Sequence, residues 1–308
     1  MKLFNPKKAA FGRHETFSLR YSWLTKGFQA LTKNPAIFTS DDATVELGVG
    51  KNMVNAIKYW LLAGNFVEQT PTAMQPTLLG EKIFAAKDGF DPYLEDEATL
   101  WLVHWQFATN AELATAWYWF FNKFHQHEFS SEEAKSALTD FVKTKLNGSY
   151  SERSVEHDVM IILKMYSPVM LRANMALDEQ LDAPLTTLHL MSCCPFTHRY
   201  QTLLDDKPRL PFEIVAFAVN EIFEQRPDVS QLPIEELMYG QNESIAVGAV
   251  FRLTEAGLLA KLELLSKHYP AYYQIRENAG INQLYRGEKI DSQQFLTDYY
   301  QNRDANRD

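Results

Sequence analysis

Three ionisable side chains stand next to one another close to the amino terminus. Residues 11–17 read FGRHETF, so Arg13, His14 and Glu15 are consecutive. Hydrolysis of a phosphodiester needs a general base or a metal ligand for the attacking water, and it needs cations on the phosphate. His14 or Glu15 can supply the first function and Arg13 the second. We therefore take His14 and Glu15 as candidate catalytic residues.

Two further cations follow this segment within about three helical turns. Arg20 and Lys26 can add contacts to a phosphate backbone, which Lys and Arg commonly make. The alternative is structural: Glu15 and Arg20 form an ion pair that holds the amino-terminal segment, and His14 makes only a hydrogen bond. Both interpretations fit the sequence.

A second set of candidate residues lies in a predicted helix that begins near residue 51. Four polar side chains fall on one face: Lys51, Asn52, Asn55 and Lys58. Four apolar side chains recur at helical spacing and predict a face directed toward a core: Met53, Ile57, Trp60 and Leu61. Because amide and ammonium groups can contact phosphates and base edges, the polar face is a candidate DNA-binding surface, which Arg13, Arg20 and Lys26 would extend.

The elements around this helix predict a winged-helix unit. Helical spacing covers residues 18–32, and Ser40 or Asp41 can cap a short helix over residues 42–47. Glycines at 48 and 50 separate it from the helix that begins at Lys51, and Gly64 ends that helix. Residues 66–68 and 74–77 can pair as a hairpin. This order of elements places a helix where it can enter a DNA major groove.

Two more modules show related patterns. In the middle, Ser130 and Glu133 have capping-box spacing before a helix that extends to residue 145, and a second helix covers residues 151–165. Short strands are predicted between Pro168 and Pro184 and over residues 185–191. The last module predicts helices over 212–225, 234–238 and 244–267, with a break near Thr254, and a hairpin from 272–275 and 283–286.

The predicted fold is therefore mainly α, with tandem winged-helix or helix-turn-helix units and short β-hairpins. We predict three domains: an amino-terminal winged helix over 1–92, a helical middle domain over 93–190, and a winged-helix-like domain over 191–308. Residues 111–124 are rich in aromatic side chains. They indicate a buried helix, with a base-stacking platform as the alternative.

Charge is distributed unevenly along the chain. The whole sequence of 308 residues has a net charge of −9, yet residues 1–60 contain nine Lys and Arg against four Asp and Glu. A local excess of positive charge in an acidic protein is consistent with a nucleic-acid contact. The only two cysteines are adjacent, and no apolar stretch approaches the roughly 20 residues of a membrane span. We expect a cytoplasmic protein without membrane segments.

Strong catalytic signatures are absent from the sequence. It contains no phosphate-binding glycine loop, no Cys/His zinc spacing and no nucleophile elbow. If the chain cleaves DNA, the expected cofactor is a divalent metal such as Mg²⁺, and the sequence assigns no ligands to it.

Four blocks carry a resemblance to a known family: FGRHETFSLRYSWLTKG at 11–27, LGVGKNMVNAIKYWLLAGNFVE at 47–68, TLWLVHW at 99–105 and WYWFFNKF at 117–124. They resemble the SspB-like family of bacterial DNA phosphorothioation (Ssp) gene clusters, formerly a domain of unknown function. The resemblance covers most of the chain by pattern, is strongest in the first 70 residues and is weak after residue 170. None of the blocks is a catalytic motif.

This resemblance implies a DNA-binding nickase of a phosphorothioation and anti-phage defence system, which cuts one strand so that sulfur can be incorporated. The implied partners are double-stranded DNA and the sulfur-transfer enzymes of the same gene cluster. The alternative is a non-catalytic winged-helix adaptor that recruits those enzymes to DNA. A third reading is a winged-helix scaffold that contacts only protein.

Overall fold

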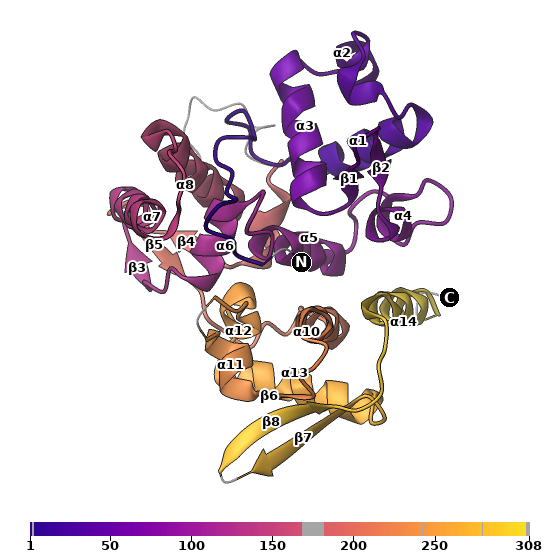
Figure 1. Cartoon of the computed structure of the whole chain (residues 1–308), viewed down its shortest axis with the longest axis vertical. Coiled ribbons are helices and arrows are strands. Elements are labelled where there is room, and N and C mark those ends of the chain that lie inside the picture. Colours follow the sequence, from indigo (N-terminus) through magenta and orange to yellow (C-terminus); the bar gives the residue numbers. More distant parts are fainter. Residues whose placement is uncertain (2, 168–181, 242, 279, 306–308) are drawn as a thin grey trace. The chain divides into compact units, whose positions relative to one another are not determined.

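The computed structural model describes residues 1, 3–167, 182–241, 243–278 and 280–305. It is mainly helical, with small antiparallel sheets, which confirms the predicted class. The chain divides into two compact units, Met1–Leu203 and Leu204–Asp308 (Figure 1). Within the described residues, no helix is both long enough and apolar enough to cross a bilayer.

The first unit begins with the predicted order of helix, short helix, helix and hairpin. These elements are α1 (Tyr21–Lys33), η1 (Ile37–Thr39), α2 (Ala43–Leu47), α3 (Lys51–Ala63), β1 (Val67–Gln69) and β2 (Met74–Pro76). Gly48 ends α2 in a left-handed conformation with φ of 62°, which glycine adopts without strain. Strands β1 and β2 pair antiparallel, with Val67 opposite Pro76. The order is confirmed, and the winged-helix assignment stays a prediction.

Helix α3 packs closely on α1 because a glycine lies where the two helices meet. A Cβ atom on Gly27 would lie 2.4 Å from Ile57 Cγ2, which is too short for any real contact. Farther along α3, Trp60 packs against Phe107 and Trp117 at ring-centroid distances of 5.1 and 5.3 Å. Burial of each large aromatic ring stabilises the fold by about 1.5–3 kcal/mol. The core therefore fixes which face of α3 points outward.

The remaining described residues of the first unit contribute helices and one small sheet. Its elements are α4 (Leu78–Phe84), α5 (Glu97–Ala108), α6 (Thr115–Asn122), β3 (Glu128–Phe129), α7 (Ser131–Lys145), α8 (Glu152–Tyr166), η2 (Pro184–Leu188), β4 (Met191–Cys193) and β5 (Tyr200–Thr202). The sheet has the order β3-β5-β4. The predicted capping box of Ser130 and Glu133 begins α7. Every residue of α6 is buried, so the aromatic tract belongs to the core.

One predicted strand is wrong. Residues 185–191 were expected to be extended, but Pro184–Leu188 forms a 3₁₀ helix and β4 begins only at Met191. Two threonine hydroxyls in this turn donate to main-chain carbonyls three residues earlier. Such bonds compete with a β ladder and stabilise the turn. The strands predicted after Pro168 fall mainly on residues 168–181, which lie outside the described residues.

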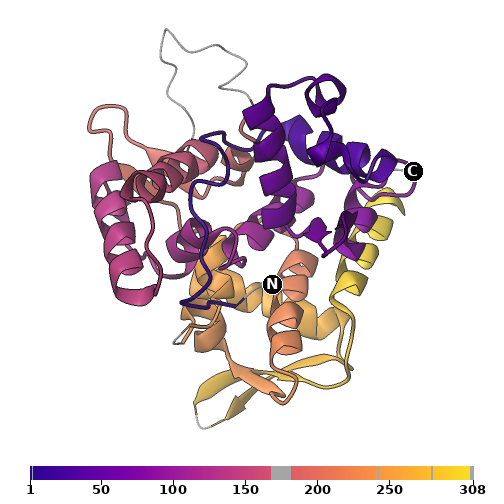
Figure 2. The ribbon, with the colours of Figure 1, turned by 45° about the horizontal axis from the view of Figure 1, so that its top comes forward.

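Residues 3–20, which we call the amino-terminal segment, contain no helix. This segment crosses the surface of α6 and α8 (Figure 2). Its main chain is tied down by side chains from both helices. The Ala10 amide donates to Thr115 Oγ1 at 3.0 Å, and the Gly12 amide donates to Asp158 Oδ1 at 2.8 Å. These bonds fix the path of the segment that carries the candidate catalytic residues.

The predicted boundaries at residues 92 and 190 do not coincide with the division into units. Side chains from both sides of residue 92 share one core, where Asn110 Nδ2 donates to the Ala63 carbonyl at 2.9 Å. The Tyr59 hydroxyl likewise donates to the Leu113 carbonyl at 3.1 Å. After residue 190, β4 and β5 join the sheet that begins with β3. The described residues between 93 and 203 therefore pack with the first module.

The second unit repeats the order of helix, short helix, helix and hairpin. Its elements are α10 (Phe212–Gln225), β6 (Gln231–Pro233), α11 (Ile234–Tyr239), α12 (Val247–Phe251), α13 (Glu255–His268), β7 (Tyr273–Asn278), β8 (Ile281–Arg286) and α14 (Ser292–Ala305). The helix predicted over 212–225 is confirmed, and so is the break near Thr254, which caps α13. The three strands form a sheet in the order β6-β8-β7.

Candidate nucleic-acid interface

The polar face of α3 is accessible, as predicted. Lys51, Asn52 and Asn55 are exposed and Lys58 is half-buried. On the inner face Ile57, Trp60 and Leu61 are fully buried, and Met53 is half-buried. The N-cap of α3 is Gly50, and no side chain accepts a hydrogen bond from the first turn. Free amide hydrogens at a helix start attract anions, and the first turn here contains no acid.

A groove joins the amino-terminal segment to α3. It has a volume of about 590 Å³, and we call it the amino-terminal groove. Its lining consists of Lys8, Ala9, Ala10, Arg13, Glu15, Asn55, Lys58, Tyr59, Leu62, Glu112 and Leu113. The groove thus brings together four of the nine predicted site residues, two from the segment and two from the helix. Lys58 also lines a smaller hollow beside the β1–β2 hairpin.

The charges in this groove include both signs. Lys8, Arg13 and Lys58 contribute three cations, and Glu15 and Glu112 contribute two carboxylates. Lys8 Nζ lies 3.1 Å from Glu112 Oε1, so these two side chains form an exposed ion pair. Arg13 and Glu15 are exposed. The arrangement therefore offers cations for a phosphate and one accessible carboxylate beside them.

The structure places His14 differently from its neighbours. Its side chain is fully buried, and Nε2 lies 2.8 Å from Asp158 Oδ1. The Thr16 amide donates to Nδ1 at 3.1 Å, so Nδ1 is the acceptor and Nε2 carries the hydrogen that is donated to Asp158. The ring also stacks on Trp60 at a centroid distance of 5.9 Å. Because a general base must reach the water that it activates, this geometry favours a structural role for His14. Its catalytic role stays a prediction.

Asp158 is the buried acceptor that organises the amino-terminal segment. Oδ1 accepts hydrogen bonds from both the Gly12 amide and the His14 ring. Burial raises the pKa of the Asp158 carboxyl, although the bonds from His14 and Gly12 act in the opposite direction. Asp158 therefore fixes the amino-terminal segment, although burial of its carboxylate is electrostatically unfavourable.

The backbone next to His14 is strained. Glu15 and Thr16 have φ angles of 52° and 68°, in the left-handed region that L-residues avoid. Thr16 is β-branched, which makes this conformation more unfavourable still. Because His14 points inward and is held by Asp158, the backbone must reverse here, and Arg13 and Glu15 are left exposed on either side of the buried ring. The hydrogen bonds of His14 thus position the Arg13 and Glu15 side chains at the groove.

Two predicted DNA contacts are engaged within the protein. The Arg20 guanidinium lies 3.8 Å from Asp182 and 5.5 Å from the centroid of the Trp23 ring. The acidic partner of Arg20 is thus Asp182, whereas the structural alternative had proposed Glu15. Lys26 is exposed, and its Nζ donates weakly to the Leu47 carbonyl at 3.4 Å. Neither residue lines the amino-terminal groove.

A divalent metal finds few ligands in the described part of the chain. No three His, Cys, Asp or Glu side chains gather there in a way that could hold an ion. Mg²⁺ often takes only one or two carboxylates, with water and substrate phosphates completing its coordination. In the amino-terminal groove, Glu15 is the accessible carboxylate, since Glu112 is paired with Lys8. Among the described residues, Glu15 is therefore the one protein carboxylate that this groove offers to a divalent ion.

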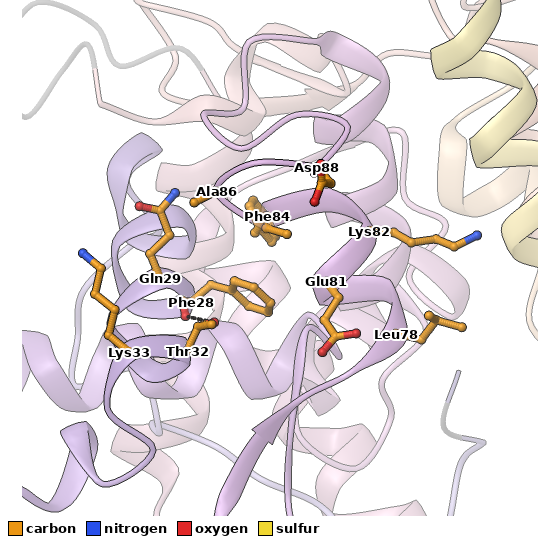
Figure 3. Close-up of a pocket in the computed structure, with 11 residues that line it drawn as sticks. Phe28, Gln29, Thr32, Lys33, Leu78, Glu81, Lys82, Phe84, Ala86 and Asp88 are labelled. Carbon is orange, nitrogen blue, oxygen red and sulfur yellow. Dashed lines mark hydrogen bonds between the residues drawn. The ribbon is translucent and has the colours of Figure 1, made fainter.

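Another pocket in the same unit lies between α1 and α4 (Figure 3). Phe28 and Phe84 form its apolar part, while Lys33 and Glu81 stand at its edge. It contains none of the predicted site residues. The amino-terminal groove is therefore the better candidate site.

Sequence reasoning did not find Asp158 or Glu112 as site residues. Asp158 is 144 residues from His14, and Glu112 is 104 residues from Lys8. No local spacing can indicate such pairs.

Comparisons with known proteins agree with the predicted resemblance. The profile of the family described as protein of unknown function (DUF4007) matches residues 11–300. A solved structure described as magnesium ion-bound SspB is 29% identical with a TM-score of 0.84, and the match covers 96% of this chain and 89% of that one. An SspB crystal structure is 30% identical with a TM-score of 0.84, covering 96% and 90%. No curated protein matches the chain.

Proposed function

The chain belongs to the DUF4007 family and is SspB-like, and from this premise we propose that it docks double-stranded DNA as a component of a bacterial phosphorothioation system. The observation that carries this proposal is the meeting of Arg13, Asn55 and Lys58 in one groove, next to the exposed first turn of α3. Lys51 and Asn52 extend the same face along the helix. Sulfur-transfer enzymes of the same system are the proposed protein partners.

The proposed docking mode follows from the geometry of α3. Its inner face is fixed by the aromatic core, so its polar face is presented without rearrangement. Lys51 and the uncapped first turn would contact phosphate, and Asn52 and Asn55 would face the base edges. Lys58 borders both the amino-terminal groove and the hollow beside the hairpin, so it would contact the backbone between them.

Strand cleavage is the fuller form of this proposal. The scissile phosphate would enter the amino-terminal groove, where Arg13 and Lys58 would offset its negative charge. Glu15 would activate the attacking water or help to hold Mg²⁺, which would supply Lewis-acid stabilisation when bound. His14 would act indirectly, by holding Arg13 and Glu15 at the groove.

A non-catalytic adaptor is the second candidate function. The burial of His14 favours it, because only one of the two predicted catalytic side chains can then meet a water molecule from solvent. In this role the same surface would dock DNA, and the sulfur-transfer enzymes would act on it. Both candidates share the interface and differ only in the use of Glu15.

A plasmid-nicking assay separates the two candidates. Purified protein would be incubated with supercoiled plasmid, with and without Mg²⁺, and the open-circle product would be measured alongside binding to a duplex oligonucleotide. Cleavage predicts that Glu15→Gln abolishes nicking and retains binding, while Glu152→Gln, an exposed acid on α8, changes neither. Binding without nicking by the wild type would support the adaptor. Absence of binding at about 50 mM salt, where phosphate contacts are strong, would refute both.

A further inference from the structure

The second unit contains a groove with a surface chemistry unlike that of the amino-terminal groove. It has a volume of about 530 Å³ and lies between α11, α13 and the turn of the β7–β8 hairpin. We call it the hairpin groove. Its apolar lining includes Tyr239, Leu259 and Ile281, and its acidic lining consists of Glu235 and Glu255. No Lys or Arg lines it.

Large apolar side chains are exposed at this groove. Tyr239 and Ile281 each expose 51% of their surface. Single exposed apolar residues are common, but two that line one groove together with half-buried Leu259 form a patch suited to a protein contact.

The acidic residues determine which partner fits. Glu235 and Glu255 are both exposed, and the Tyr239 hydroxyl donates to Glu255 Oε1 at 2.5 Å. Two carboxylates beside apolar side chains repel phosphate and attract ammonium or guanidinium groups. A nucleic acid is therefore disfavoured here.

We propose that the hairpin groove binds an apolar segment of a partner protein that carries Lys or Arg beside its apolar residues. Tyr239, Leu259 and Ile281 contact the apolar side chains of that segment. Glu235 and Glu255 accept hydrogen bonds from its cations. The second unit thus serves as a protein-docking module, which is independent of the DNA contact proposed for the first unit.

Two synthetic peptides test this proposal by fluorescence anisotropy. Both are 18 residues long with the same leucine face, and one carries Lys and Arg where the other carries Glu. The proposal predicts that the full chain binds the basic peptide and not the acidic one. Ile281→Ser should weaken binding roughly tenfold, because one buried aliphatic contact is lost. Leu264→Ser is the matched control, since Leu264 is exposed on α13 but does not line the groove.

A second pair of variants tests the charges. Glu235→Gln with Glu255→Gln should lower the affinity for the basic peptide and reduce the salt dependence of its binding. Glu263→Gln should leave the affinity and the salt dependence unchanged. Equal binding of the two peptides, failure of both to bind, or equal losses in the groove and control variants would overturn the proposal. So would a wild-type dimer that Ile281→Ser abolishes.

Discussion

Helices α3 and α13 hold the same place in the order of elements, since each directly precedes a hairpin, yet their exposed faces differ. Helix α3 exposes Lys51, Asn52 and Asn55. Helix α13 exposes Glu255, Ala256, Ala260, Glu263, Leu264, Lys267 and His268. The inner faces are both mainly apolar, although that of α13 also contains the buried Lys261.

This contrast separates what builds a module from what the module binds. The inner residues determine the packing of each helix, and the outer residues are free to vary because they contribute little to the core. The charge of each unit agrees with the difference: Met1–Leu203 has 19 Lys and Arg against 22 Asp and Glu, and Leu204–Asp308 has 11 against 17. The DNA contact proposed for the first unit and the protein contact proposed for the second both depend on these exposed faces.

The largest effect is expected from removal of the buried acceptor at Asp158. Asp158→Ala leaves the His14 Nε2 hydrogen and the Gly12 amide without their partner, and we expect the free energy of unfolding to fall by about 3 kcal/mol. Denaturant unfolding followed by circular dichroism measures this. If the two units are as distinct as proposed, DNA binding should weaken while peptide binding at the hairpin groove is retained. Equal loss of DNA binding and of peptide binding would contradict the proposed independence of the two units.

Charge reversal on α3 should have the next largest effect. Lys51→Glu with Lys58→Glu should lower DNA affinity on the order of 100-fold near 0.1 M salt and make the salt dependence shallower by about 1.8 in slope, because two phosphate contacts are lost. A titration of a duplex oligonucleotide at several salt concentrations measures both. The matched control is Lys267→Glu with Lys289→Glu, which changes the net charge equally but lies in the second unit. An equal loss in the control would show that only overall charge matters.

A smaller effect is expected from pH. Because burial raises the pKa of Asp158, the folded state binds its proton more tightly than the unfolded state does. The stability of the wild type relative to Asp158→Asn should therefore fall as the pH rises from about 4 through the raised pKa, and then stay constant. The amide oxygen of Asn can still accept both hydrogen bonds. Unfolding of both proteins between about pH 4 and 7 tests this. A stability difference that rises with pH would contradict the conclusion that burial raises the pKa of Asp158.

The smallest effect concerns the strained loop. Thr16→Gly should stabilise the protein by up to about 1 kcal/mol, since relief of the left-handed strain outweighs the greater freedom of glycine in the unfolded chain. Gly12→Ala should destabilise it, because Gly12 has φ of 69° and a Cβ there would lie 3.1 Å from Ser154 Cβ. Thermal unfolding of the two variants measures both signs. If Thr16→Gly instead destabilises, the threonine makes contacts that exceed the strain.

Local patterns predicted most of the elements, because their determinants lie within a few residues of one another. The capping box before α7, the glycines around α3 and the full extent of α10 are of this kind. The strand predicted over residues 185–191 failed because threonine favours strands by propensity but also bonds to nearby carbonyls in a turn. Propensity cannot decide between these two uses of the same side chain.

The candidate site could be predicted only in part. The polar face of α3 followed from helical spacing, and the exposure of Asn52 and Asn55 agrees with it. The position of His14 could not be predicted, because the buried partner Asp158 comes from a helix far along the chain. Likewise, the engagement of Arg20 depends on Asp182. A catalytic role and a structural role require the same residue types, and only the distant partner distinguishes them.

The aromatic core has a practical consequence for experiments on this chain. All six tryptophans belong to the first unit and are at most 3% exposed: Trp23, Trp60, Trp101, Trp105, Trp117 and Trp119. The second unit contains none. Indole emission therefore reports on opening of the first unit alone, with a red shift as water reaches the rings. A labelled site in the second unit would supply the complementary signal, so one titration can resolve whether the two units unfold together.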